Sequence, residues 1–251
     1  MAFTAHNVLL NDGSQTIPGK EEFVEDTTTF QAAVRSMRNS FGANLAGLRV
    51  VDLGCLEGGY AAGFARLGMI SKGIEVRQSN LDNCEIVRQG LALPNLSFVK
   101  DDVLNLEKYG SFDVVFCSGL LYHLDNPKAF IEVMARCAAK MIILHTHYAT
   151  HEPSIHANLS EVETNEGMQG RWFGEHEEND DEGREKHKWA SWGNHRSFWN
   201  MKGGLFDMLR ANGFSLVYEQ MDWLGGRIEA KMEVDGGYRN SQRTMIVGVR
   251  A

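Results

Sequence analysis

The sequence predicts an α/β fold in which a doubly wound, mostly parallel sheet carries helices on both faces. Apolar runs of strand length alternate with segments of helical periodicity through residues 48–146, and this alternation is typical of parallel sheets. Near the end of the chain, residues 227–250 instead alternate apolar and polar positions around Asp235-Gly236-Gly237. That pattern predicts an antiparallel hairpin at the C-terminal side of the sheet.

Five apolar runs form the predicted parallel strands. They are Leu48–Gly54, Ser71–Val76, Leu96–Asp102, Phe112–Ser118 and Lys140–Thr146. Helices are predicted between them over residues 60–68, 79–93 and 125–138. Ser79 and Asp82 have the spacing of a capping box, and Pro127 follows Asn126 at the first position of its helix. These signals set where two of the three helices begin.

The two ends of the chain extend this core. Residues 1–44 supply a polar lead and one helix, Thr28–Ser40, that packs Phe30, Val34 and Met37. Residues 45–251 form the main domain, and residues 146–200 lack a clean period and are predicted to be an insertion after the fifth strand. A helix over 201–213 and a strand over 214–223 then resume the alternation. No repeat or inter-domain linker is visible.

Composition narrows the class of protein. The chain has 251 residues, 43% of them hydrophobic, and a net charge of −8, which argues against general nucleic-acid binding. The first residues lack the basic start of a signal peptide, and no apolar run reaches about 18 residues. Four cysteines without a CxxC pair favour a reduced compartment. We therefore expect a soluble, cytoplasmic protein without membrane contact.

The stretch VVDLGCLEGGY (50–60) is a strand that ends in a glycine-containing loop. A phosphate-binding P-loop requires Lys and Ser/Thr after its second glycine, but Tyr60 and Ala61 follow Gly59. A dinucleotide loop requires glycine at the position of Leu56. Glu75 lies at the distance from Gly54 at which an acid meets ribose hydroxyls. The loop therefore suits a ligand that has a ribose but no phosphate there.

Four motifs in this order resemble those of class I S-adenosylmethionine-dependent methyltransferases. They are VVDLGCLEGG, in which Leu56 replaces the family's middle glycine, GIEV, VKDDV and FDVVFCSGLLYHLDNP. The resemblance implies S-adenosylmethionine as cofactor and a Rossmann-like methyltransferase fold with seven strands. It also implies twelve cofactor-binding residues: Asp52, Gly54, Cys55, Leu56, Gly58, Glu75, Val76, Asp102, Val103, Cys117, Ser118 and Tyr122.

Three functions stay open on the sequence alone. The first is methyl transfer to an O, N or C atom of a small molecule. The second is tRNA modification, because SGLLYHL (118–124) and residues 197–214 resemble enzymes that carboxymethylate wobble uridine, and Arg35, Arg38 and Arg49 could supply a basic face. The third is a catalytically silent cofactor-binding protein, suggested by Leu56. The sequence does not specify the acceptor or the oligomeric state.

Aromatic and basic residues of the insertion are predicted to bind the methyl acceptor. We expect the insertion to form a lid over the acceptor site. His147 and His123 are candidate general bases. The four histidines of HTHYATHEPSIH (145–156) could also be interpreted as metal ligands, but we expect no metal. We expect the acidic stretch 175–188 to be mobile without ligand. The candidate substrate-binding residues are Trp189, Trp192, His195, Arg196 and Trp199.

Overall fold

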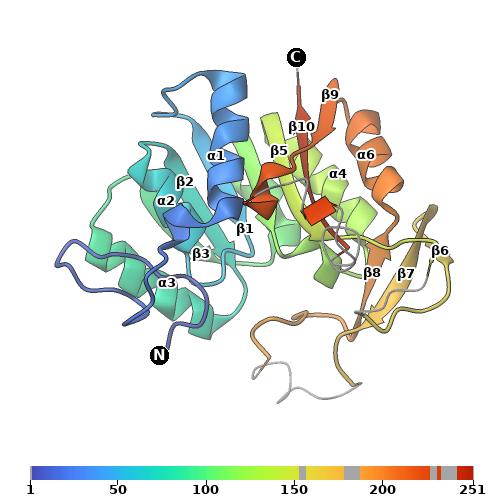
Figure 1. Cartoon of the computed structure of the whole chain (residues 1–251), viewed down its shortest axis with the longest axis horizontal. Coiled ribbons are helices and arrows are strands. Elements are labelled where there is room, and N and C mark those ends of the chain that lie inside the picture. The colour runs from blue at the N-terminus through green and yellow to red at the C-terminus, as the bar shows by residue number, and fades with distance from the viewer. Residues whose placement is uncertain (1, 153–156, 178–186, 227–230, 233–241, 251) are drawn as a thin grey trace. The chain divides into compact units, whose positions relative to one another are not determined.

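The computed structural model describes residues 2–152, 157–177, 187–226, 231–232 and 242–250 (Figure 1). Its main sheet has seven strands in the order β3-β2-β1-β4-β5-β10-β9, and a second sheet has three in the order β6-β7-β8. The predicted α/β fold class, with a mostly parallel sheet and antiparallel C-terminal strands, is confirmed. The chain divides into two compact units, residues 1–116 with 137–141, and residues 117–136 with 142–251.

The first unit is built on three parallel strands. These are β1 (Arg49–Leu53), β2 (Ile70–Glu75) and β3 (Leu96–Lys100), and Asp52 pairs with Gly73 while Glu75 pairs with Lys100. Helices α2 (Gly59–Arg66) and α3 (Gln78–Leu91) connect them. Val50, Val51 and Leu53 of β1 are all fully buried, as expected for a strand covered on both faces. The ends of β1 and β2 carry the acids that the sequence singled out.

The residues before β1 pack against this unit. A short 3₁₀ helix, η1 (Val24–Asp26), leads into α1 (Thr28–Phe41), and Phe30, Val34 and Met37 of α1 are buried as predicted. The N-terminal lead is not only polar, because Val8 is fully buried in a cluster with residues of α2 and α3. Val8 therefore belongs to the core of the first unit, and Phe3 and Leu10 pack partly buried against it.

The predicted capping box at Ser79 and Asp82 is wrong. Helix α3 begins at Gln78, and its N-cap residue, Arg77, makes no side-chain capping bond. The backbone N–H of Arg77 donates instead to the Glu75 carboxylate at 2.8 Å, so the chain turns into the helix around Glu75. Asp82 accepts a bond from Gln78 Nε2 at 2.8 Å. Ser79 therefore lies in the first turn of α3, where the Leu81 N–H donates to the Arg77 carbonyl at 3.1 Å.

The second unit contains the end of the main sheet. Helix α6 (Lys202–Ala211) precedes β9 (Leu216–Glu219), and β9 pairs antiparallel with β10 (Arg243–Val249). The predicted turn Asp235–Gly237 lies outside the described residues, and Lys231–Met232 is helical rather than extended. Strands β4 (Phe112–Ser118) and β5 (Ala138–His147) contribute residues to both units, and the other elements here are η3 (Leu121–His123), α4 (Pro127–Cys137) and η4 (Asp222–Leu224). Helix α4 begins at the proline, as predicted.

The described residues of the insertion after β5 are built around a small antiparallel sheet that the sequence did not reveal. Its strands are β6 (Glu163–Asn165), β7 (Met168–Gly174) and β8 (Arg196–Asn200), with Trp172 opposite Phe198. Figure 1 shows them beside α6. Residues 178–186, the centre of the acidic stretch, lie outside the described residues. None of the helices within the described ranges is long and apolar enough to cross a membrane.

Candidate active site

The loop between β1 and α2 has an unusual backbone. Gly54 and Gly58 have positive φ angles of 65° and 78°, and Leu56 between them has φ 52° although it is not glycine. Left-handed backbone costs a non-glycine residue about 1–2 kcal/mol. Two contacts hold it: Leu56 N–H donates to Glu75 Oε2 at 2.9 Å, and the Cys84 thiol donates to Leu56 O at 3.2 Å. Leu56 thus adopts a conformation that glycine would take at no cost.

Glu75 anchors the loop from the end of β2. Its carboxylate is buried and accepts the backbone N–H groups of Leu56, Val76 and Arg77 at 2.8–3.0 Å. Burial raises the pKa of Glu75, while the hydrogen bond and the positive charge of Arg77 oppose that rise. A carboxylate in this position can accept further bonds from ligand hydroxyls.

Asp52 is a second buried carboxyl at the end of β1. Burial raises its pKa to about 7, and nearby Glu75 adds to the rise, whereas a backbone hydrogen bond from Ala61 lowers it. Among the described residues, Asp52 Oδ2 has no hydrogen-bond partner. Buried polar atoms are almost always satisfied. Its unpaired oxygen makes Asp52 a candidate for hydrogen bonding to a ligand.

The remaining candidates in the first unit have structural contacts. Asp102 is exposed and accepts the Leu104 N–H at 2.9 Å, which caps the 3₁₀ helix η2 (Val103–Tyr109). Val103 is buried at the start of that helix. The Cys55 and Cys84 sulfurs lie 3.9 Å apart, and burial raises the pKa of the Cys55 thiol.

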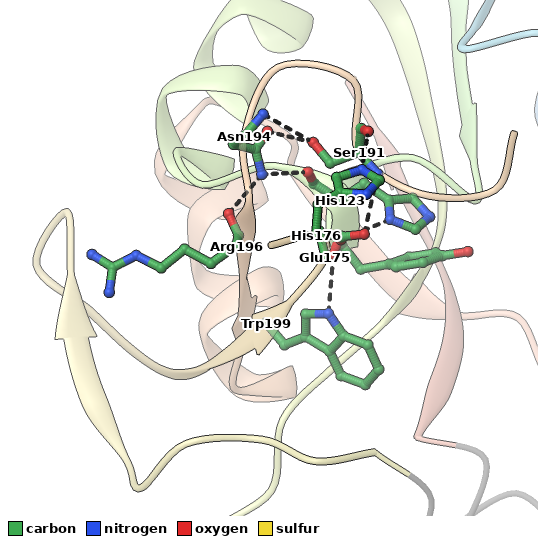
Figure 2. Close-up of polar contacts among 8 residues, drawn as sticks. His123, Glu175, His176, Ser191, Asn194, Arg196 and Trp199 are labelled. Carbon is green, nitrogen blue, oxygen red and sulfur yellow. Dashed lines mark hydrogen bonds and ion pairs between the residues drawn. The ribbon is translucent and has the colours of Figure 1, made fainter. Parts of the chain in front are cut away.

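In the second unit, His123 and Glu175 form a hydrogen-bonded pair (Figure 2). His123 Nδ1 lies 2.8 Å from Glu175 Oε1, and the Glu175 side chain is 1% exposed. Ser191 N–H donates to the other carboxylate oxygen at 3.1 Å, and Asn194 Nδ2 donates to the His123 carbonyl at 3.0 Å. Burial alone would raise the pKa of Glu175, but its hydrogen bond with His123, and then that from the Ser191 N–H, help to outweigh burial and lower it. Glu175 is therefore a carboxylate that orients the imidazole.

His147 lies in an aromatic cluster. Its ring stacks on Trp199 at 4.8 Å and meets the Tyr122 ring edge-on at 4.6 Å. His147 Nδ1 is 3.2 Å from the carbonyl oxygen of Gln242, an acceptor that requires the proton on Nδ1. The indole N–H of Trp199 donates to the Tyr122 carbonyl at 3.0 Å. Both predicted histidines thus contact Tyr122 (4.2 Å between the His123 and Tyr122 ring centroids).

His145 has a different role from His147. Burial and then the charge of Arg243 hold its pKa well below the usual value, so the ring is neutral. Arg243 Nε donates to His145 Nε2 at 3.1 Å, which leaves the ring proton on Nδ1, 3.2 Å from Ser118 Oγ. His145 therefore positions Ser118 and Arg243 rather than accepting a proton. Cys117 is buried beside Ser118 in the sequence.

The predicted substrate residues separate into two groups. Trp199 is 6% exposed and packs within the small sheet, where Phe173 stacks on it at 5.4 Å. Trp189 and Trp192 are 59% and 37% exposed. The Arg196 guanidinium lies 4.1 Å from the centre of the Trp172 ring, and the His195 carbonyl accepts the Glu175 N–H at 2.8 Å. Only Trp199 lies in the cluster around Tyr122.

The histidines of residues 145–156 do not define a metal centre in the described part of the chain. No group of three or more His, Cys, Asp or Glu residues there could hold a metal ion. His145 and His147 have the contacts given above, and His156 lies outside the described residues.

A family model described as a methyltransferase domain matches residues 44–195, which is more than half of the chain. The chain belongs to this methyltransferase domain family. The match includes the loop after β1, both buried acids, and the His123–Glu175 pair. The resemblance seen in the four sequence motifs is thereby confirmed at the level of the family.

Curated relatives match part of this methyltransferase chain. A ubiquinone biosynthesis O-methyltransferase of Cupriavidus pinatubonensis is 33% identical over 95 residues, covering 37% of this chain and 38% of the relative. The protein of the same name from Neisseria meningitidis serogroup A is 33% identical over 100 residues, covering 38% and 41%. The matched segment is thus under half the length of these relatives.

Solved structures share the fold over nearly the whole chain. The N-terminal domain of EvdMO1, crystallised with SAH and D-fucose, is 23% identical, with a TM-score of 0.66 and coverage of 96% of this chain and 88% of that one. Magnesium protoporphyrin IX methyltransferase from Synechocystis PCC 6803 with bound SAM is 18% identical, with a TM-score of 0.55 and coverage of 89% and 78%. At these identities the likeness concerns the fold.

Three functional candidates were missed from the sequence. Glu175 looked like part of a solvated acidic stretch, Arg243 like one residue of a hairpin, and Glu57 like an unremarked position of the loop. All three depend on partners far away in the sequence: 52 residues separate Glu175 from His123, 98 separate Arg243 from His145, and 53 separate Glu57 from Thr4. No local spacing signals such contacts.

Proposed function

We propose that the protein is an S-adenosylmethionine-dependent methyltransferase that acts on a small molecule. The observation that carries the proposal is the buried carboxyl pair of the methyltransferase domain: Asp52 has a carboxyl oxygen without a partner, and Glu75 holds the adjoining loop. Two acids at neighbouring strand ends suit a ligand rich in hydroxyl and ammonium groups.

The first unit would hold the nucleoside part of the donor. Glu75 would accept bonds from the ribose hydroxyls, and the backbone of Gly54 and Leu56 would line the loop. Asp102 and Val103 would meet the adenine. Cys55, Gly58 and Val76 complete the set in this unit, and Cys117, Ser118 and Tyr122 are proposed for the methionine end. When bound, the cofactor supplies a methyl group already activated by its sulfonium.

His123 would act as the general base on the acceptor side. Glu175 accepts the Nδ1 proton and so fixes the tautomer in which Nε2 has a free lone pair. Among the described residues, His123 Nε2 has no hydrogen-bond partner, and the side chain is 15% exposed. Nε2 would take the proton from an acceptor hydroxyl or amine as that atom bonds to the methyl carbon. His147 remains the second candidate base, and its ring would line the same aromatic cluster.

The insertion over residues 146–200 would supply the acceptor side of the site. It provides Glu175, which orients the base, and Trp199, which lies against Tyr122 and His147. The exposed Trp189, Trp192, His195 and Arg196 would contact the acceptor as it enters. Relatives named as O-methyltransferases of ubiquinone biosynthesis favour an oxygen atom as the acceptor. We place the enzyme in the cytoplasm, where its four cysteines would stay as the thiols observed.

A substrate screen tests this function. The purified protein is incubated with S-adenosylmethionine and a panel of phenols, amines and sugars, and formation of S-adenosylhomocysteine is measured. Release that depends on a phenolic or other small acceptor supports the proposal. Release only with bulk tRNA would replace it by tRNA modification. If the protein binds the cofactor and methylates nothing in a broad panel, it is a silent binding protein.

A further inference from the structure

Glu57 lies in the loop between β1 and α2, which we call the donor loop. Its carboxylate is fully buried and is bound by residues near the N-terminus of the chain. We call residues Thr4–His6 the amino-terminal strap. Glu57 Oε1 accepts Thr4 N at 2.7 Å and Thr4 Oγ1 at 3.0 Å, and Oε2 accepts Ala5 N at 3.0 Å and His6 N at 3.1 Å. Burial alone would raise the pKa of Glu57, but these bonds outweigh burial and lower it. Glu57 is therefore an ionised anchor for three consecutive N–H groups.

The strap and the loop are also joined in the opposite direction. Gly59 N–H donates to His6 Nδ1 at 3.0 Å, and the His6 ring contacts Tyr60 edge-on at 5.0 Å. The strap is fixed on its outer side as well, because Lys20 Nζ donates to the Ala5 carbonyl and Thr16 Oγ1 donates to the His6 carbonyl. The strap is thus bonded to the loop on one side and to Thr16 and Lys20 on the other.

The strap acts next to the strained residue of the loop. Leu56 precedes Glu57 and has the left-handed conformation described above, at the position where the family motif has glycine. Such a conformation persists in a residue with a side chain only where the surrounding structure imposes it. Glu75 and Cys84 hold the peptide groups of Leu56, and the strap holds the residue that follows.

We propose that the amino-terminal strap, through Glu57, compensates for the missing glycine by holding Leu56 in the conformation from which the loop binds the methyl donor. Glu57 is a positioning residue in this account, since it acts through Leu56 and the loop backbone. The inference rests on the proposed function for the identity of the ligand. It implies that the strap is needed because residue 56 is leucine.

A double-mutant cycle tests that dependence. Glu57→Gln, Leu56→Gly and the double variant are compared with the wild type for their Kd for S-adenosylhomocysteine. The amide of Gln cannot accept on both sides, so Glu57→Gln should weaken binding about tenfold in the wild-type chain. In the Leu56→Gly chain the same change should alter Kd by less than about twofold. Glu21→Gln, at an exposed acid of the same N-terminal region, is the matched control and should have no effect.

If Glu57→Gln weakened S-adenosylhomocysteine binding equally in the wild-type and Leu56→Gly chains, the inference would be overturned, because the strap would then act independently of Leu56. Should Glu57→Gln fail to fold, Thr4→Val removes one donor to Glu57 and is carried through the same cycle. The thermal unfolding midpoints of the same proteins separate this inference from the proposed function. If the wild type binds no S-adenosylhomocysteine, the function fails, and the inference is judged by unfolding. If Glu57→Gln lowers the unfolding midpoint less in the Leu56→Gly chain than in the wild-type chain, the inference is supported. If it lowers the midpoint equally in both, the inference is refuted.

Discussion

His123 and Glu175 are joined by a hydrogen bond of 2.8 Å between Nδ1 and Oε1, although 52 residues separate them in the sequence. The bond ties η3 to the end of β7 and leaves Nε2 as the basic nitrogen of His123 (Figure 2). A histidine oriented by a buried carboxylate is suited to remove a proton from an acceptor.

Removing the proposed base, His123, should affect turnover and leave donor binding intact. We expect His123→Ala to reduce turnover by about 100-fold, and Glu175→Gln to reduce it by a smaller factor, because glutamine cannot accept from both His123 and Ser191. Steady-state rates and the Kd for S-adenosylhomocysteine are measured together. Glu177→Gln, an exposed neighbour, is the control. Normal rates in His123→Ala would transfer the role to His147, whose Ala variant is run alongside.

The two kinds of tryptophan in the insertion should respond differently to truncation. Trp199 is almost fully buried against His147 and Phe173, so Trp199→Ala should lower the free energy of unfolding by about 3–5 kcal/mol. Trp189 is 59% exposed, and Trp189→Ala should leave stability unchanged while weakening the apparent affinity for the acceptor. Chemical denaturation and acceptor KM measure the two effects. A stable Trp199→Ala protein would contradict the packing described here.

Strand β7 offers a matched pair of glycines that tests the small sheet. A Cβ at Gly170 would lie 2.4 Å from the backbone oxygen of Trp199, whereas a Cβ at Gly174 would meet nothing within 4 Å. We expect Gly170→Ala to lower the free energy of unfolding by about 1–3 kcal/mol and Gly174→Ala to leave it nearly unchanged. Equal midpoints for the two variants in denaturant unfolding would rule out the β7–β8 pairing.

The stability contributed by His6 should depend on pH. Burial lowers the pKa of His6 to about 4 from 6.5, so between these values the unfolded chain binds the extra proton. The contribution is complete above pH 6.5 and is lost as the pH falls toward 4. The pKa of Asp52 is raised to about 7, so its contribution to stability has the opposite pH dependence and is lost as the pH rises toward 7.

A comparison with His6→Asn isolates this contribution, because asparagine keeps an acceptor for Gly59 but does not titrate. The difference in unfolding free energy between the wild type and His6→Asn should increase by about 3 kcal/mol from pH 4 to pH 6.5. Unfolding in denaturant across this range provides the measurement. A difference that stays constant with pH would show that His6 is not buried as a neutral ring.

Most of the main sheet could be predicted from the sequence because its signals are local. The apolar run of β1, the proline at the start of α4 and the spacing of Phe30, Val34 and Met37 each indicate an element without reference to distant residues. The capping box failed because helix α3 begins at Gln78, ahead of Ser79, and the Leu81 N–H donates to the Arg77 carbonyl as part of the helix.

The small sheet and the contacts around the site could not be predicted in the same way. Strands β6, β7 and β8 are short, and β7 and β8 are separated by a long acidic stretch, so no period is visible. His123 was recognised as a candidate base, but its partner Glu175 was hidden among other acids. The left-handed Leu56 was expected only as a departure from a motif. Its conformation and its support by Glu75 emerge only in three dimensions.

The most direct test of the account is a calorimetric titration of S-adenosylhomocysteine into the purified protein and into Asp52→Asn. The wild type should bind at one site per chain, with a Kd in the range of roughly 1 µM to 1 mM. Asp52→Asn places an amide N–H₂ group where the unpartnered oxygen now lies, and binding should weaken about tenfold without loss of folding. Absence of saturable binding by the folded wild-type protein would contradict the central claim that this methyltransferase domain uses S-adenosylmethionine.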